Sequence, residues 1–261
     1  MTVLRYSLQD ARQWASFSGD RNPIHFDRDW VKRQGGKALS VHGMRALLDV
    51  KQFMGSGQHP VPYAKCTVRL RKPLWCDTRY RLQWDNGKAN AATVIDMADG
   101  LPALTCQFTP ATQLPVSDIY SSIALNVQTQ RELQHAFAPL LPNAQQWHYL
   151  DALLFRHLLH DTALLRQPGI SPLLPGEMTL EGIFTRFPVV QTHQETVFEA
   201  PLFDRWQPEI PAETLILNTH DALVIGDISD GAIVRLVAST HYQNKGIWSA
   251  ITLKIGPTTH R

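Results

Sequence analysis

The sequence predicts an α+β fold in which helices precede antiparallel strands. Residues 8–55 carry helical periodicity, whereas apolar and polar residues alternate from residue 64 onward, as in half-buried strands. Asp85-Asn86-Gly87-Lys88 separates two of the alternating runs and predicts a hairpin, because Asn-Gly tolerates the positive φ values of such turns. The order of helices and then strands returns after residue 129, without sequence identity between the two parts.

Composition and charge exclude several classes of protein. The chain has 261 residues, 44% of them hydrophobic and 18% charged, which suits one large or two small globular domains. A formal net charge of +2 argues against a nucleic-acid partner. We expect no membrane insertion, because no apolar run approaches the ~18–20 residues of a membrane-spanning helix. The N-terminus lacks a signal-peptide pattern, which favours a cytoplasmic location.

The first part, residues 1–112, begins with helices. Ser7 with Asp10 predicts the start of a helix that ends at Gly19. Asp27 caps a short helix over 28–34, and an apolar helix begins near residue 43 and ends at Gly55 and Gly57. Four strands follow, over 64–72, 76–84, 90–97 and 101–110. The three cysteines, Cys66, Cys76 and Cys106, fall in strand-like runs without metal-ligand spacing, so we expect small buried side chains and neither a metal site nor a disulfide.

The second part shows the same order of elements. Residues 113–128 are interpreted as a linker or a crossing strand. Helices are predicted over 130–141 and 147–167, with a less regular one over 177–187. Strand-like runs follow over 195–204, 213–220, 222–229 and 232–243. On the helix over 147–167, His157, His160 and Asp161 have spacing compatible with metal ligation, but a polar face on a packed helix is the simpler interpretation.

The segment "SFSGDRNPIHFDRDW", residues 16–30, places an acid and an imidazole on a turn. Pro23 disfavours the helical conformation for Asn22 and removes an amide donor, so an irregular loop is expected. On such a loop the side chains of Asp20 and His25 can converge on one water, one taking a proton and the other delivering one. The spacing alone agrees equally with a simple Asx-type turn and a surface histidine.

A longer pattern adds a resemblance. "FSGDRNPIHFD" is followed by "VHGM", and together they closely resemble the signature of the MaoC-like, (R)-specific enoyl-CoA hydratases. The matching residues are Phe17, Ser18, Asp20, Asn22, Pro23, Ile24, His25, His42, Gly43 and Met44. The resemblance covers residues 5–112 and includes "VRLRKPLWCDTRYRLQW". It implies a hot-dog fold, an antiparallel sheet wrapped around one long helix, and an activity without metal or cofactor.

The resemblance implies a lyase that hydrates enoyl thioesters or dehydrates (R)-3-hydroxyacyl thioesters, carried on CoA or on acyl carrier protein. Asp20 and His25 would hold the water and share the proton transfers, in an order that the sequence leaves open. The Gly43 backbone N–H, at a helix start, would stabilise the enolate oxygen. Asn22 and His42 would support the loop and the helix start beside Met44. Lys51 stands near where relatives often carry a hydroxyl close to the water, so the third partner of that water is open.

Residues 129–261 lack the motif, and the resemblance implies a degenerate second hot-dog that replaces the partner subunit of a dimer. The chain would then be a double hot-dog with one active site, able to pair again as a homodimer. Two other functions stay open. A hot-dog thioesterase would need a carboxylate on the central helix, for which Asp49 is the candidate. A non-catalytic acyl-thioester-binding protein is the other, and Lys51 is its only support.

Overall fold

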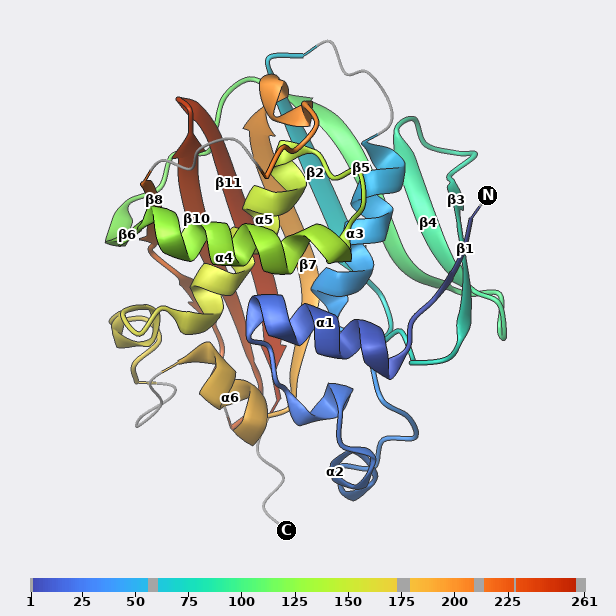
Figure 1. Ribbon diagram of the computed structural model, residues 1–261. Coiled ribbons are helices and arrows are strands. Elements are labelled where there is room, and N and C mark those ends of the chain that lie inside the picture. The colour runs from blue at the N-terminus through green and yellow to red at the C-terminus, as the bar shows by residue number, and fades with distance from the viewer. Residues whose placement is uncertain (1, 56–60, 173–178, 209–213, 228, 257–261) are drawn as a thin grey trace.

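A single antiparallel sheet of eleven strands forms the framework of the chain in the computed structural model, which describes residues 2–55, 61–172, 179–208, 214–227 and 229–256. The long helices α3 (Gly43–Met54) and α5 (Gln146–His160) lie against one face of this sheet (Figure 1). Within the described ranges, no helix combines the length and the apolar character needed to cross a membrane.

The elements fall into two sets of the same kind. The first set comprises β1 (Thr2–Arg5), α1 (Leu8–Ser18), α2 (Arg28–Arg33), α3 (Gly43–Met54), β2 (Tyr63–Leu70), β3 (Arg79–Trp84), β4 (Ala91–Asp96) and β5 (Pro102–Ala111). The second comprises β6 (Ile119–Leu125), α4 (Val127–Phe137), α5 (Gln146–His160), α6 (Leu180–Arg186), β7 (Val189–Glu199), β8 (Leu215–His220), β9 (Leu223–Ile225), β10 (Ala232–Tyr242) and β11 (Lys245–Ile255).

The strand order shows that the two sets share one topology. Along the sheet the order is β1-β3-β4-β5-β2 and then β7-β11-β10-β8-β6, with β9 added beside β10. Read from the outer edge inward, each half places its first strand at the edge and the strand after its long helix at the centre. Each half is therefore a hot-dog around α3 or α5, and the chain is a double hot-dog of the α+β class. The predicted fold class is confirmed.

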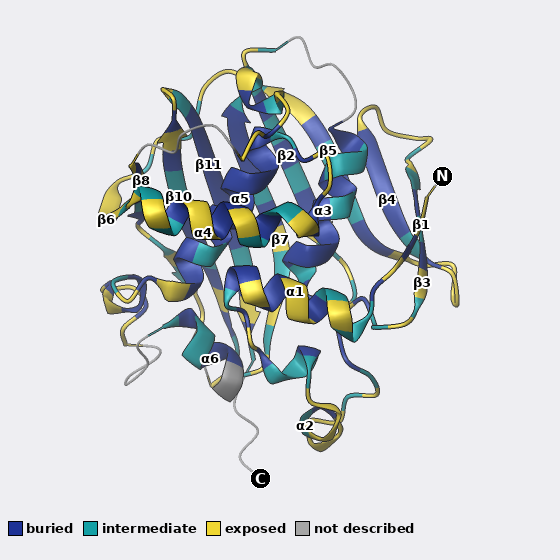
Figure 2. Cartoon of the chain, in the orientation of Figure 1, coloured by how far each residue is buried: buried dark blue, intermediate teal, exposed yellow. Residues whose placement is uncertain are grey.

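The two halves join along β2 and β7, which run antiparallel from the pair Tyr63–Glu199 to the pair Arg69–His193. The expected linker, residues 113–128, contains β6, which pairs with β8 at the far edge of the second half. Buried residues concentrate on the strands and on the sheet-facing sides of the helices, whereas α1 and α4 expose a stripe to solvent (Figure 2). This pattern follows from covering one sheet face with amphipathic helices.

Local signals set most boundaries in the first half. Ser7 and Asp10 form a reciprocal capping box at the start of α1. Gly19 ends that helix in the left-handed conformation, at φ 79°. Asp27 accepts hydrogen bonds from two amides at the start of α2. Cys66 and Cys106 are buried free thiols and Cys76 is partly exposed.

Several predicted boundaries in the second half are wrong. The helix predicted over 147–167 ends at His160, because Asp161 adopts an extended conformation and short 3-10 turns follow. The strand predicted over 195–204 is β7, which starts at Val189 and gives way to a 3-10 turn after Glu199. The irregular helix over 177–187 is α6, with residues 177 and 178 outside the described ranges.

Two strands, β1 at the edge of the sheet and β11, have no counterpart in the sequence-based prediction. Strand β11 is buried on both faces over much of its length, so apolar and polar residues alternate little along it.

A buried polar network joins the two long helices and the centre of the sheet. Lys51 of α3 and Asp151 of α5 form a salt bridge, with 1% and 0% of their side chains exposed. Gln194 of β7 accepts from the Lys51 ammonium at 2.8 Å and donates to the Asp151 carboxylate at 2.9 Å. The hydroxyls of Thr196 and Ser249 also donate to that carboxylate, at 2.8 and 2.9 Å. The two buried charges are thus paired and their oxygens satisfied, as burial requires.

We predict that Lys51→Met destabilises the protein strongly. The change leaves the Asp151 carboxylate buried without its cation, which costs about 3–5 kcal/mol of the free energy of unfolding. The double variant Lys51→Met/Asp151→Leu should recover a large part of this loss, because it removes both charges. The measurement is urea unfolding. Lys65→Met is the control, since Lys65 pairs with Glu195 at 3.1 Å in a partly exposed position, and such pairs are worth about 0–1 kcal/mol. Equal losses in both single variants would contradict the prediction.

Candidate active site

The loop after α1 is held by a chain of short-range hydrogen bonds. The Ser18 hydroxyl accepts from the Asp20 amide at 3.1 Å, and the Asp20 carboxylate accepts from the Asn22 amide at 3.2 Å. The side chain of Asn22 in turn accepts from the Ile24 amide at 3.2 Å and starts a single 3-10 turn, Pro23–His25. These successive Asx-type turns fix the backbone without a helix. Asp20, Asn22 and His25 are all buried.

His25 is oriented by a residue that the motif does not include. The Ser40 carbonyl lies 2.9 Å from Nδ1 of His25 and accepts a hydrogen bond from it. The proton of a neutral His25 therefore sits on Nδ1, which leaves Nε2 as the unprotonated nitrogen. Ser40 lies in the connection between α2 and α3, and no periodicity or motif in the sequence pointed to it.

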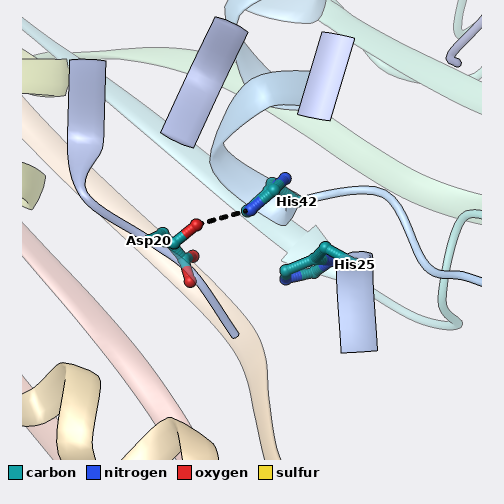
Figure 3. A group of neighbouring side chains, drawn as sticks. All are labelled: Asp20, His25 and His42. Carbon is teal, nitrogen blue, oxygen red and sulfur yellow. Dashed lines mark hydrogen bonds between the residues drawn. The ribbon is translucent and has the colours of Figure 1, made fainter. Parts of the chain in front are cut away.

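His42 joins the loop to the start of α3. Its ring stacks on that of His25, with centroids 3.7 Å apart, and its Nε2 donates to the Asp20 backbone carbonyl at 3.1 Å (Figure 3). His42 is the N-cap residue of α3 but makes no side-chain capping bond. Its contacts thus hold the loop against the helix start and leave the first amides of the helix uncapped by its side chain.

Burial shifts the pKa values of the acid and the imidazole in opposite directions. It raises the pKa of the Asp20 carboxyl to about 7, with a further rise from the nearby charge of Glu181 and an opposing effect of the Asn22 amide hydrogen bond. It lowers the pKa of His25 to about 4 against the hydrogen bond to Ser40. Both shifts favour the neutral form, as desolvation does. At pH values between about 4 and 7 the pair therefore carries one proton, on Asp20.

The same residues form the one cluster in the described part of the chain that could gather around a metal ion. Donor atoms of Asp20, His25 and His42 all lie within 4.8 Å of one another. However, the two imidazole planes are only 28° from parallel, so their in-plane lone pairs run side by side and do not converge. The Nε2 atom of His42 is also engaged with a carbonyl. This arrangement suits proton transfer better than ligation.

A cavity of about 260 Å³ opens onto Asp20 and His25. Both halves of the chain form its walls. The first half contributes Asp20, Asn22, Ile24, His25, Ser40, Val41, Gly43, Met44 and residues 70–75, and the second half contributes Phe155, Phe184, residues 189–192 and Leu253. Most of these side chains are apolar, as in many small-molecule sites. The polar ones come from the loop and the segment before α3, from Arg71 and Lys72 after β2, and from Gln191 and Thr192 of β7.

Gly43, the first residue of α3, faces this cavity at a crowded point. A Cβ atom at this position would lie 3.0 Å from Leu70 Cδ2 and 3.1 Å from Gln191 Oε1. Any larger residue would therefore push against β2 and β7. The first amides of a helix lack intrahelical acceptors and carry the positive end of the helix dipole. The Gly43 amide thus suits an anionic oxygen in the cavity.

Helix α5 of the second half holds the loop in place through two hydrogen bonds. Arg156 donates to the Phe17 carbonyl at 2.7 Å, and His160 donates to the Ser18 carbonyl at 2.9 Å. These two carbonyls belong to the last turn of α1, where no intrahelical donor remains for them. The His160 ring also packs against Gly19, with Nε2 only 2.2 Å from where a Cβ would stand. The sequence indicated that His160 lies on a polar helix face, but it did not indicate its partner.

Some candidate residues lie elsewhere. Lys51, at the position where relatives often carry a hydroxyl, does not line the cavity, because its ammonium is bound in the network with Asp151. Asp49 does not line the cavity and pairs with Arg45 at 2.9 Å.

The polar residues at the end of α5 bind other protein groups. His157 contacts the Thr219 hydroxyl at 2.8 Å, and this hydroxyl also donates to Asp161. His157 and Asp161 therefore share the Thr219 hydroxyl, whereas His160 binds the Ser18 carbonyl.

Comparisons with known proteins agree on the fold. No family model and no curated protein matches the sequence. Among solved structures, a putative MaoC domain protein dehydratase from Chloroflexus aurantiacus is 8% identical and has a TM-score of 0.50, over 99% of this chain and 93% of that chain. A Mycobacterium tuberculosis protein described as a double hotdog is 14% identical, with a TM-score of 0.45 over 97% and 93%. A putative oleoyl thioesterase from Lactobacillus plantarum is 10% identical, with a TM-score of 0.43 over 98% and 96%.

We predict that Gly19→Ala is more harmful than Gly35→Ala. Both glycines have positive φ values, 79° and 76°, but Gly35 has nothing within 4 Å of its Cβ position, whereas Gly19 faces His160. Gly35→Ala should cost only the left-handed backbone, about 1–2 kcal/mol. Gly19→Ala should cost more in urea unfolding, because it also displaces His160 from the Ser18 carbonyl. Adding His160→Ala should return part of the difference. Equal losses for the two glycines would contradict the proposed contact.

Proposed function

We propose that this protein is a hydro-lyase that adds water to enoyl thioesters and removes it from (R)-3-hydroxyacyl thioesters, carried on CoA or acyl carrier protein. The observation that carries the proposal is the pair Asp20 and His25, buried at one cavity with opposite pKa shifts. The motif resemblance supplies the substrate class. The double hot-dog fold agrees with it, but a fold by itself does not select a reaction.

The distance between the two side chains suits a bridging water. A ring nitrogen of His25 and a carboxyl oxygen of Asp20 lie no more than 4.8 Å apart, close enough for one water to hydrogen-bond to both groups. With His25 neutral and Asp20 protonated between about pH 4 and 7, we assign His25 as the base and Asp20 as the acid of hydration. The two pKa shifts support this order of proton transfer, which the sequence left open.

In the proposed reaction, His25 Nε2 takes a proton from the water while the water oxygen bonds to Cβ of the substrate. The electron pair of the Cα–Cβ double bond moves toward the thioester, and negative charge develops on its carbonyl oxygen. The Gly43 amide, at the α3 start, donates to that oxygen. Asp20 then delivers its proton to Cα. The imidazolium proton returns to the Asp20 carboxylate when the next water enters, which restores the pair. Dehydration follows the same steps in reverse.

The thioesterase alternative lacks a suitable carboxylate on the described central helices, α3 and α5. Asp49 on α3 is paired with Arg45, and Asp151 on α5 is paired with Lys51. Neither residue lines the cavity. Water addition at Cβ needs no nucleophilic carboxylate at the thioester carbon, so the acid–imidazole pair favours hydration.

We predict that Asp20→Asn and His25→Ala each lower the rate of enoyl-CoA hydration by about 10²-fold or more, the usual contribution of a general acid or base. The assay follows the loss of enone absorbance over a panel that begins with crotonyl-CoA and extends to longer chains. A thiol dye run in parallel separates hydration from thioester hydrolysis. Asp29→Asn and His135→Ala change exposed residues of the same types and should keep full activity. Full activity in Asp20→Asn would rule out the assignment.

We predict a bell-shaped dependence of kcat/KM on pH. Hydration needs His25 deprotonated and Asp20 protonated, so the rate should rise through about pH 4 and fall through about pH 7. Dehydration should have the same profile, because both directions need one proton on the pair. Glu181→Gln should move the alkaline limb to lower pH, since the Glu181 charge contributes to the raised pKa of Asp20. A limb that stays in place, or moves upward, would contradict this electrostatic contribution.

A further inference from the structure

Gln191 of β7 faces the start of α3 from the opposite half of the chain. It lines the same cavity as Asp20 and His25. Its carbonyl oxygen Oε1 lies 3.1 Å from the position of a Cβ on Gly43. Its amide nitrogen Nε2 donates to the Met44 sulfur at 3.6 Å. The carboxamide therefore sits beside the amide to which the proposed function assigns the enolate oxygen.

A β-bulge directs Gln191 into the cavity. The pairing of β7 with β11 shifts by one residue, so that Thr252 pairs with His193 and Leu253 pairs with Gln191. Thr192 is the extra residue, and its hydroxyl donates to the Thr252 carbonyl at 3.3 Å. Strict alternation from the buried Gln194 would turn Gln191 to the outer face of the sheet. The bulge instead places it on the inner face, opposite Leu253, which also lines the cavity.

The present partner of the Gln191 amide is a poor one. A thioether sulfur is a weak hydrogen-bond acceptor, far weaker than a carbonyl or enolate oxygen. A substrate oxygen that reaches the Gly43 amide would lie within the same corner of the cavity. The Gln191 N–H group can then exchange the Met44 sulfur for that oxygen at little cost, and the gain grows as negative charge develops there.

We propose that Gln191 is a second donor to the thioester carbonyl oxygen, and that the second half of the chain thereby contributes a catalytic residue. The inference rests on the proposed function for the identity of the substrate. The oxygen would accept from the Gly43 backbone of one half and from the Gln191 side chain of the other. The reacting oxygen would thus be held at the junction of the two hot-dogs.

Kinetics of Gln191→Leu provide the first test. The variant keeps the size of the side chain but removes its donor, so kcat for hydration should fall by about 10²-fold, the effect of losing one oxyanion donor. KM should rise by no more than roughly 3- to 10-fold, the loss of one hydrogen bond to the bound substrate. Gln191→Glu should fall similarly at neutral pH, because a carboxylate donates no hydrogen bond. His193→Leu, on the same strand with its side chain exposed, is the matched control and should keep wild-type kcat. Urea unfolding of each variant separates catalytic loss from misfolding.

Ligand binding provides the second test, without turnover. Hexanoyl-CoA has the thioester carbonyl, and S-hexyl-CoA lacks it. The wild type should bind the thioester more tightly than the thioether, and Gln191→Leu should lose roughly 3- to 10-fold in affinity for the thioester alone, as expected for one hydrogen bond. A residue that only supports the fold would change both affinities together.

The outcomes separate the two proposals. Wild-type kcat in Gln191→Leu, with Asp20→Asn inactive, would overturn the role of Gln191 and leave the proposed function standing. Absence of hydration by the wild type over the whole panel would overturn the proposed function, and the binding comparison would then judge Gln191 by itself. Equal wild-type affinity for the thioester and the thioether, or no binding of either, would overturn the inference in every case.

Discussion

The buried salt bridge between Lys51 and Asp151 is the constraint on which the rest of the structure depends. Each charge comes from the central helix of a different half, and neither has solvent to stabilise it. The two helices must therefore keep one relative position, with β7 beside them supplying Gln194 and Thr196. The catalytic loop, the α3 start and the end of α5 all belong to the elements that this network holds in place.

The candidate active site is built from both halves of the chain. The first half carries the groups assigned to react, Asp20, His25 and the Gly43 amide. The second half carries none of the motif, yet Arg156 and His160 hold the loop through backbone carbonyls, and Phe155, Phe184 and residues 189–192 close the cavity. A degenerate repeat can lose its own motif without loss of function, provided that it keeps these contacts to the other half.

The electrostatics of the site come from desolvation more than from charge pairing. Burial raises the pKa of Asp20 and lowers the pKa of His25, so one proton stays on the pair between about pH 4 and 7. The salt bridge between Lys51 and Asp151 lies away from the cavity, and the Glu181 charge adds less than burial does to the raised pKa of Asp20. A salt-bridged Asp20 would ionise at low pH and would not serve as an acid. The low polarity of the cavity walls is thus part of the proposed chemistry.

The local structure of the site follows directly from the sequence. Pro23 and Asn22 dictate an irregular loop, Ser7 and Asp10 start α1, and Gly19 ends it, because each effect acts within a few residues of backbone. The repeated order of helices and strands also indicated the two halves.

Which distant groups meet is visible in the tertiary structure alone. Lys51 lies on the same helix as Gly43, about two turns further along, yet it pairs with Asp151, one hundred residues away in the sequence. Gln191 reaches the cavity because a single extra residue in β7 reverses the side that it faces. Periodicity defines the face of an element that is buried, but the partner across that face, and the register of the strand that carries it, are set by packing between segments that the sequence order does not bring together.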